Sequence, residues 1–111
     1  TDRMDSWVDD ITFNPDARVA HVLGMVAHNE SLEFGSREFS YDTYGNIQIN
    51  KLSEVIEAVI AQDPEEFEGV QTSAEFADRF FFEPLGMNHS EWSGYYFAFG
   101  WISNLRDMAR L

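Results

Sequence analysis

The sequence predicts a mainly α-helical fold with little or no sheet. Three segments repeat apolar residues at the spacing of a helix face, and residues that cap or terminate helices flank them. No segment alternates apolar and polar residues for long enough to predict a strand, and residues 95–102 are the best candidate. We therefore expect helices over residues 17–27, 47–61, 73–82 and 104–111.

The first predicted helix follows Asn14 and Pro15. Its apolar residues share one face at the i, i+3, i+4, i+7 spacing: Val19, Val22, Leu23 and Val26. Residues 29–46 then carry Gly35, Gly45, several serines and mixed aromatic residues without a period. This pattern predicts a loop, and loops often carry functional residues.

The second predicted helix, 47–61, has the clearest pattern. Its apolar residues are Leu52, Val55, Ile56, Val59 and Ile60. Residues 62–71 are rich in Asp and Glu and contain Pro64 and Gly69, which predicts a solvated turn region rather than a cation site.

Capping residues place the last two predicted helices. Thr72 or Ser73 can cap the third helix, with Glu75 as the return arm of a capping box. Its apolar stripe is Phe76, Ala77, Phe80 and Phe81, and Pro84 and Gly86 are expected to end it. Asn104 can cap the final helix.

The composition fits one small folded domain. Of the 111 residues, 44% are hydrophobic and 15% aromatic, which argues against a disordered acidic chain. The formal net charge of -13 opposes binding to nucleic acid or an anionic membrane, because both depend on Lys and Arg. The chain contains no cysteine, has no apolar run long enough to span a bilayer and opens with no signal peptide, so we expect it to be soluble.

Most motifs that carry chemistry are absent. Neither Ser-x-x-Lys, Gly-x-Ser-x-Gly nor His-Glu-x-x-His occurs, and Lys51 is the sole lysine. His21 and His28 would lie about 10 Å apart along the first helix, too far to hold one metal ion. We interpret both as structural and His89 as a surface residue in a turn, and we expect no metal and no cofactor.

One constellation stands out. Tyr44-Gly45-Asn46 runs directly into the helix that carries Val55-Ile56-Glu57. It resembles the Tyr-x-Asn motif of the penicillin-recognising serine hydrolases (class C β-lactamases, DD-peptidases and esterases), which precedes a helix ending in an Ile-Ile-Glu-like turn. Phe39-Ser40-Tyr41 offers an alternative register, but it leaves Thr43 in the place of the Asn and adds three residues before Glu57, so we prefer Tyr44.

Three further segments resemble the same family, in the family's order. Residues 83–87 are similar to its Pro-Leu-Gly-Met signature, with Ser90 at a usual Thr and Trp92 where a tryptophan often follows. Residues 99–111 look like its glycine, small hydroxyl and Asp-Met-Ala-Arg-Leu helix, and residues 21–25 resemble His-Leu-Leu-x-Met. The resemblance covers most of the chain from about His21.

The resemblance implies a fold and a reaction. Residues 1–111 would form a single helical region, the middle of a β-lactamase-like (α plus α/β) domain and therefore an incomplete domain. Thr1 is not an initiator Met, and the last residues lie in an unfinished helical pattern, which also predicts an excerpt. The family transfers an acyl group from an ester, amide or β-lactam to a serine and then to water.

The implied site is partial. Tyr44 and Asn46 would be its catalytic residues, and Trp92 and Trp101 would line the pocket for a small ester or amide substrate in a complete parent. Without Ser-x-x-Lys this chain alone is predicted to be inactive, and its uncovered helices predict a homo-oligomer or swapped assembly. The alternative function is a free-standing acidic helical module that binds a partner without catalysis.

Overall fold

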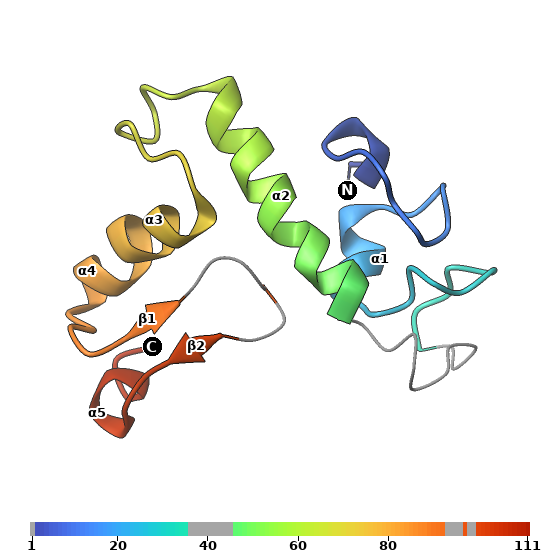
Figure 1. Ribbon diagram of the computed structural model, residues 1–111. Helices are drawn as coiled ribbons and strands as arrows, with labels where there is room; N and C mark the ends of the chain where they lie inside the picture. The colour runs from blue at the N-terminus through green and yellow to red at the C-terminus, as the bar shows by residue number, and fades with distance from the viewer. Residues whose placement is uncertain (1, 36–45, 93–96, 98–99) are drawn as a thin grey trace.

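The computed structural model describes residues 2–35, 46–92, 97 and 100–111. Within these residues the fold is mostly helical with only a two-stranded sheet, which confirms the predicted mainly α class (Figure 1). In chain order its elements are η1 Met4–Ser6, α1 Val19–Leu23, α2 Asn46–Gln62, α3 Ser73–Ala77, η3 Asp78–Phe82, α4 Glu83–Leu85, β1 Glu91–Trp92, β2 Trp101–Ile102 and α5 Leu105–Met108. No helix in the described ranges is both long and apolar enough to cross a bilayer.

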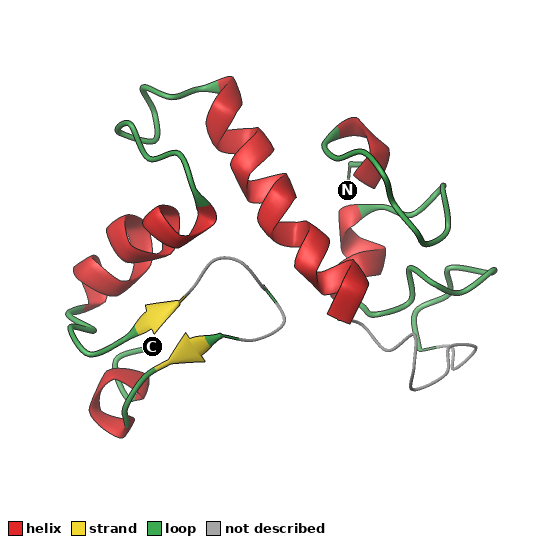
Figure 2. Ribbon diagram, viewed as in Figure 1, coloured by secondary structure: helices red, strands yellow, loops and turns green. Residues whose placement is uncertain are grey.

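The N-terminal part lies beside α2 (Figure 2), and its apolar side chains form a cluster there. A backbone hydrogen bond from Met4 to Ala17 and an isolated bridge between Arg3 and Arg18 hold the two ends of this part together. The buried members of the cluster are Met4, Val8, Phe13, Ala17, Val22, Ala27 and Leu52. Since Leu52 belongs to α2, the long helix completes this core.

Helix α1 is shorter than predicted. It ends at Leu23 because Met25 takes a left-handed conformation, with φ at 59°. The N–H of Met25 bonds to Val22 and the N–H of Val26 bonds to His21, which is the hydrogen-bond pattern of a Schellman cap. The turn buries Val26 and Ala27 and places His28 beyond the helix, so the predicted 17–27 span was wrong at its C-terminal end.

Helix α2 is the longest element and lies between the two halves of the molecule (Figure 1). One of its stripes, Ile49, Leu52 and Val55, packs into the N-terminal cluster. The adjacent stripe carries Ile56 and Ile60, and Ile60 is buried on the side of Val70. The predicted helix over 47–61 is confirmed, with one more residue at each end.

Elements α3, η3 and α4 form one continuous helix over residues 73–85. Thr72 caps it, as predicted, by accepting a hydrogen bond from the N–H of Glu75. Glu75 returns a bond to the N–H of Gln71, one residue before the expected partner. Element η3 is a π-helical turn that ends two residues before Pro84. In a regular α-helix the Pro84 ring would clash with the carbonyl group four residues earlier, and the wider π turn accommodates it.

The end of this helix is set by glycine. The sequence predicted that Pro84 and Gly86 would end the helix, but Pro84 lies within its last turn. Gly86 stops it with φ at 68°, and a Cβ there would also collide with the Arg110 side chain. Gly86 is therefore favoured both by its backbone conformation and by a close neighbour.

The C-terminal part is a short hairpin followed by α5. Strands β1 and β2 are antiparallel, with Glu91 opposite Ile102 and Trp92 opposite Trp101. Asn104 caps α5 as predicted, since its side chain accepts a 2.8 Å hydrogen bond from the N–H of Asp107. The helix ends at Met108 rather than continuing to 111, because the N–H groups of Arg110 and Leu111 bond three residues back in tighter turns.

Exposed apolar side chains predict self-association. Ile102 of β2 is 62% and Leu105 of α5 87% exposed. Trp101, the neighbour of Ile102 in β2, lines an open apolar pocket with Ile56 of α2 and residues of η3. Because such surfaces tend to associate, we expect a dimer or swapped assembly in light scattering. The Leu105→Glu variant should be largely monomeric. The control Leu23→Glu changes an exposed leucine of α1, 62% exposed, and should leave the assembly intact. A clean monomer at high concentration would contradict the prediction.

Candidate functional site

Of the two predicted catalytic residues, Asn46 lies within the described part of the structure and Tyr44 does not. Tyr44 and the alternative Tyr41 lie outside the described residues, and Asn46 is the first residue of α2. Lys51, a turn and a half further along α2, binds Glu54 at 2.9 Å and approaches the carbonyl oxygen of Asp9. The sole lysine is therefore engaged in an ion pair with its own helix.

Two buried polar groups lie close to the start of α2. Gln48 is fully buried, and its Oε1 accepts a hydrogen bond from the N–H of Ala27 at 3.1 Å. Its Nε2 and the Nε2 of His28 have no hydrogen-bond partner among the described residues. Buried polar groups are usually paired, so this end of the helix retains hydrogen-bonding capacity.

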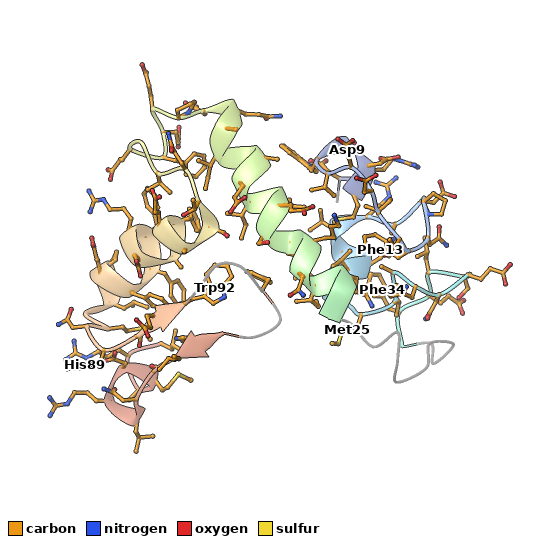
Figure 3. All side chains as sticks on the ribbon, viewed as in Figure 1. Asp9, Phe13, Met25, Phe34, His89 and Trp92 are labelled. Carbon is orange, nitrogen blue, oxygen red and sulfur yellow. The ribbon has the colours of Figure 1, made fainter. Side chains whose placement is uncertain are left out.

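The histidines do not form a metal site. His21 accepts a hydrogen bond from the N–H of Arg18 and packs against Phe34, with ring centroids 5.4 Å apart. His28 packs edge-on against Phe13, and burial lowers its pKa below that of a free histidine. Across the ranges that the structure describes, no group of three or more His, Asp or Glu side chains is arranged to hold a metal ion. Figure 3 shows Phe13 and Phe34 in the N-terminal part and His89 at the opposite end of the molecule.

Glu57 of the Val-Ile-Glu turn joins two helices. Its Oε1 accepts hydrogen bonds from both the N–H and the hydroxyl of Ser73, each 3.1 Å long. Ser73 is fully buried at the start of α3. The carboxylate therefore fixes the N-terminus of α3 against α2, where its negative charge also interacts favourably with the helix dipole.

A second polar connection joins the two C-terminal motif segments. Asp107, 1% exposed, accepts 2.8 Å hydrogen bonds from the N–H of His89 and the hydroxyl of Ser90. Ser103 lies 2.6 Å from the Ser90 oxygen. From the next turn, the Arg110 guanidinium donates to the carbonyl oxygen of Gly86 at 3.3 Å. We call these contacts the C-terminal latch.

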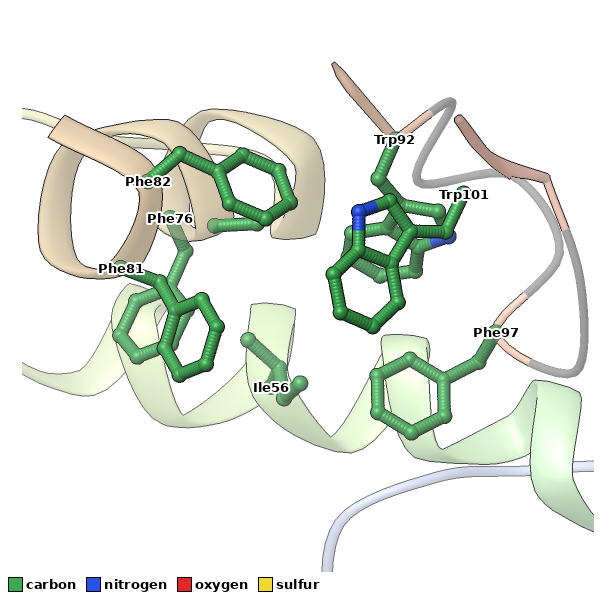
Figure 4. A pocket seen from close by; sticks show the side chains of 8 residues that line it. Ile56, Phe76, Phe81, Phe82, Trp92, Phe97 and Trp101 are labelled. Atoms are coloured by element: carbon green, nitrogen blue, oxygen red, sulfur yellow. The ribbon is translucent and has the colours of Figure 1, made fainter. Parts of the chain in front are cut away.

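The two predicted substrate-binding residues face each other in the hairpin. Trp92 and Trp101 are register partners, and both line a pocket with a volume of about 390 Å³. Its aromatic lining is Phe76, Phe81, Phe82, Trp92, Phe97 and Trp101. Ile56 of α2 and Ala77 of α3 complete the walls, and we call this cavity the aromatic pocket (Figure 4).

The aromatic pocket has the chemistry of binding rather than of proton transfer. Every side chain that lines it is apolar or aromatic, and none is an acid, a histidine or a lysine. The Phe82 and Trp101 rings lie 5.9 Å apart and the Trp92 and Phe97 rings 5.2 Å apart, within the range of favourable aromatic pairs. The pocket can therefore bury an apolar group but cannot by itself activate a nucleophile.

Sequence reasoning found only part of this pocket. It identified Trp92 and Trp101, and it assigned Phe76, Ala77 and Phe81 to an ordinary helix stripe. It did not assign Phe82 or Phe97, because the π turn rotates Phe82 out of the regular helical pattern and Phe97 belongs to no periodic segment. The run Arg79-Phe80-Phe81-Phe82 before Pro84 was the available signal.

No protein-family model matches the chain, and neither a curated protein nor a solved structure matches it. The resemblance to the penicillin-recognising hydrolases therefore depends on the motif segments alone. Two of the connections described above, Glu57 with Ser73 and Asp107 with Ser90, start from residues of those segments.

Removing the carboxylate of the C-terminal latch should destabilise the chain. Asp107→Ala should remove the acceptor of two part-buried donors, the N–H of His89 and the hydroxyl of Ser90, of which the hydroxyl keeps Ser103 as a partner. The free energy of unfolding should fall by about 2 kcal/mol. Denaturant unfolding followed by circular dichroism measures the change. Asp107→Asn keeps an acceptor oxygen and should cost less, and Glu65→Ala, an exposed carboxylate outside the latch, should be near neutral. An Asp107→Ala variant as stable as the parent chain would show that the latch carries no stability.

Proposed function

We propose that the chain is the helical part of a serine hydrolase that transfers an acyl group from an ester, amide or β-lactam. In this proposal it supplies the Tyr44-Gly45-Asn46 wall of the active site. The observation that carries the proposal is the order and connection of the motif segments. Four segments follow the family's order. Glu57 and Asp107 belong to two of them, and their carboxylates hold neighbouring elements in place through hydrogen bonds.

The proposed chemistry needs groups from outside this chain. A phenol has an unperturbed pKa near 10, so Tyr44 can accept or donate a proton near neutral pH only beside a positive charge. Lys51 is paired with Glu54, so a Ser-x-x-Lys segment of a larger parent would have to supply both the nucleophile and the cation. Asn46 would orient the substrate or the tyrosine through its amide.

The aromatic pocket gives the substrate an apolar binding surface in this proposal. Asn46 and Ile56 lie ten residues apart on α2, so these two residues are separated by about 15 Å along the helix axis. Trp92 and Trp101 would then contact a part of the substrate remote from the reacting carbonyl. Binding energy from such remote groups can be used to position the reacting carbonyl.

A second candidate function is a partner-binding module without catalysis. The exposed apolar side chains of β2 and α5 favour it, because they are available to a partner protein. Gene context distinguishes the two functions. A Ser-x-x-Lys segment upstream and a Lys- or His-Thr-Gly-like triad downstream favour the hydrolase, and the absence of both from the complete gene would favour the module.

The motif tyrosine can be tested in a parent that carries the Ser-x-x-Lys segment. Tyr44→Phe removes the hydroxyl that transfers the proton but keeps the ring, so hydrolysis should slow by about 10²- to 10⁴-fold with little loss of stability. The matched control Tyr41→Phe should have a much smaller effect. Steady-state hydrolysis of an ester substrate measures both, and the reverse ranking would identify Tyr41 as the motif residue.

The chain by itself should form no acyl-enzyme. None of its serines is followed three residues later by lysine. Ser53 donates to the Asn50 carbonyl on a regular helix, and the Ser73 and Ser90 hydroxyls bind Glu57 and Asp107. Among the residues that the structure describes, no hydrogen bond pairs a serine with Lys51 as a base for attack. Intact-mass spectrometry after incubation with a fluorescent penicillin should show the unmodified mass, and a stoichiometric adduct on any serine would refute this prediction.

A further inference from the structure

We infer that the aromatic pocket binds the neutral, apolar part of a small ligand. In the proposed hydrolase this part would be the apolar group of the ester or amide, an assignment that rests on the proposed function. Binding to the pocket itself does not rest on it, because every residue that lines the pocket lies within the described part of the chain.

The pocket has two aromatic walls, and Ile56 of α2 lies between them. Figure 4 shows Phe81 and Phe82 on one side, Trp92 and Trp101 on the other, and Ile56 between them. The two walls come from η3 and from the hairpin, and they meet where the Phe82 and Trp101 rings pack 5.9 Å apart. The C-terminal latch holds α5 against the His89–Ser90 turn, which leads directly into β1.

The rings lining the pocket keep free surface. Phe81 is 43%, Trp101 44% and Phe97 36% exposed, although large aromatic side chains gain most from burial. A volume of about 390 Å³ lies in the range of small-molecule sites, about 300 to 1,000 Å³. An apolar group placed against these rings would cover their exposed faces.

The uncharged lining of the pocket and the negative net charge of the chain exclude charged groups as occupants of the pocket. No charged side chain lines the pocket, and the chain carries a formal net charge of -13. An anionic group would be repelled by this charge, and a charged group inside the pocket would lose its hydration without gaining an ion pair. The group that enters the pocket should therefore be uncharged, with any polar end of the ligand left at the opening.

Titration with N-phenylnaphthylamine, a neutral aromatic dye that fluoresces in apolar surroundings, tests the inference on the chain as it exists. We expect saturable binding with a dissociation constant between about 1 and 100 μM. Trp101→Ala removes one wall and should weaken binding by at least about tenfold, whereas Trp101→Phe keeps a ring and should bind nearly as well. Phe34→Ala removes an exposed aromatic side chain, 64% exposed, from the N-terminal part and should have no effect.

Three further measurements separate the alternatives. If Trp101→Ala fails to fold by circular dichroism, Phe81→Ala replaces it, because it removes a smaller ring, from the opposite wall of the pocket. Leu105→Glu should bind the dye as the parent chain does, and a loss of binding as protein concentration rises would identify a second copy as the occupant instead. Steady-state ester hydrolysis is measured separately, in the parent that carries the Ser-x-x-Lys segment, so failure of the proposed function would not affect the dye test.

Absence of dye binding to the parent chain would overturn the inference. Equal binding by Trp101→Ala, or an equal loss in Phe34→Ala, would also overturn it, because the dye would then be reporting general apolar exposure. Dye binding confined to the aromatic pocket would support it whether or not the chain belongs to a hydrolase.

Discussion

The structure depends on the capacity of α2 to pack on two sides at once. Its stripe of Ile49, Leu52 and Val55 completes the N-terminal cluster, and the adjacent stripe of Ile56, Glu57 and Ile60 faces the rest of the chain. Both stripes repeat at three and four residues, so one helix can serve both. The first stripe is covered, whereas part of the second opens into the aromatic pocket. The half of the molecule that follows α2 therefore keeps the surface available for binding.

Polar contacts compensate for the thin apolar packing of the C-terminal half. Asp107 is almost fully buried in a four-residue helix, which could not persist alone, because so short a helix forms few of its own hydrogen bonds. Its carboxylate is tied to the turn that precedes β1, and Arg110 is tied to the glycine that ends α4. The Pro-Leu-Gly-Met and Asp-Met-Ala-Arg segments thus have a physical reason to occur together, independent of any reaction. A motif resemblance of this kind is evidence for shared architecture before it is evidence for shared catalysis.

Sequence reasoning succeeded where the signals were local. The repeat in 47–61, the caps at Thr72 and Asn104 and the stop at Gly86 each depend on residues within one or two turns, and the structure has all of them. It failed where a non-local or unusual conformation decided the outcome. A left-handed Met25, which no composition rule favours, ended α1 early, and Pro84 was accommodated by a π turn instead of ending the helix. The aromatic pocket needed a pairing between 92 and 101 that no single periodic segment reveals.

The position of the pocket explains how binding and catalysis could be divided in a chain of this kind. A site that moves protons needs charged groups close to the reacting atoms, and the same groups would weaken an apolar pocket by drawing water into it. Here the pocket adjoins Ile56, with no charged side chain in its lining, while the buried amide of Gln48 and the residue Asn46 belong to the first turn of the same helix. Because backbone hydrogen bonds keep the rise of a helix constant, the distance between Asn46 and Ile56 is fixed by α2 rather than by a loop. A ligand held at one end would thus have its other end placed reproducibly, which is the condition under which remote binding can assist a reaction.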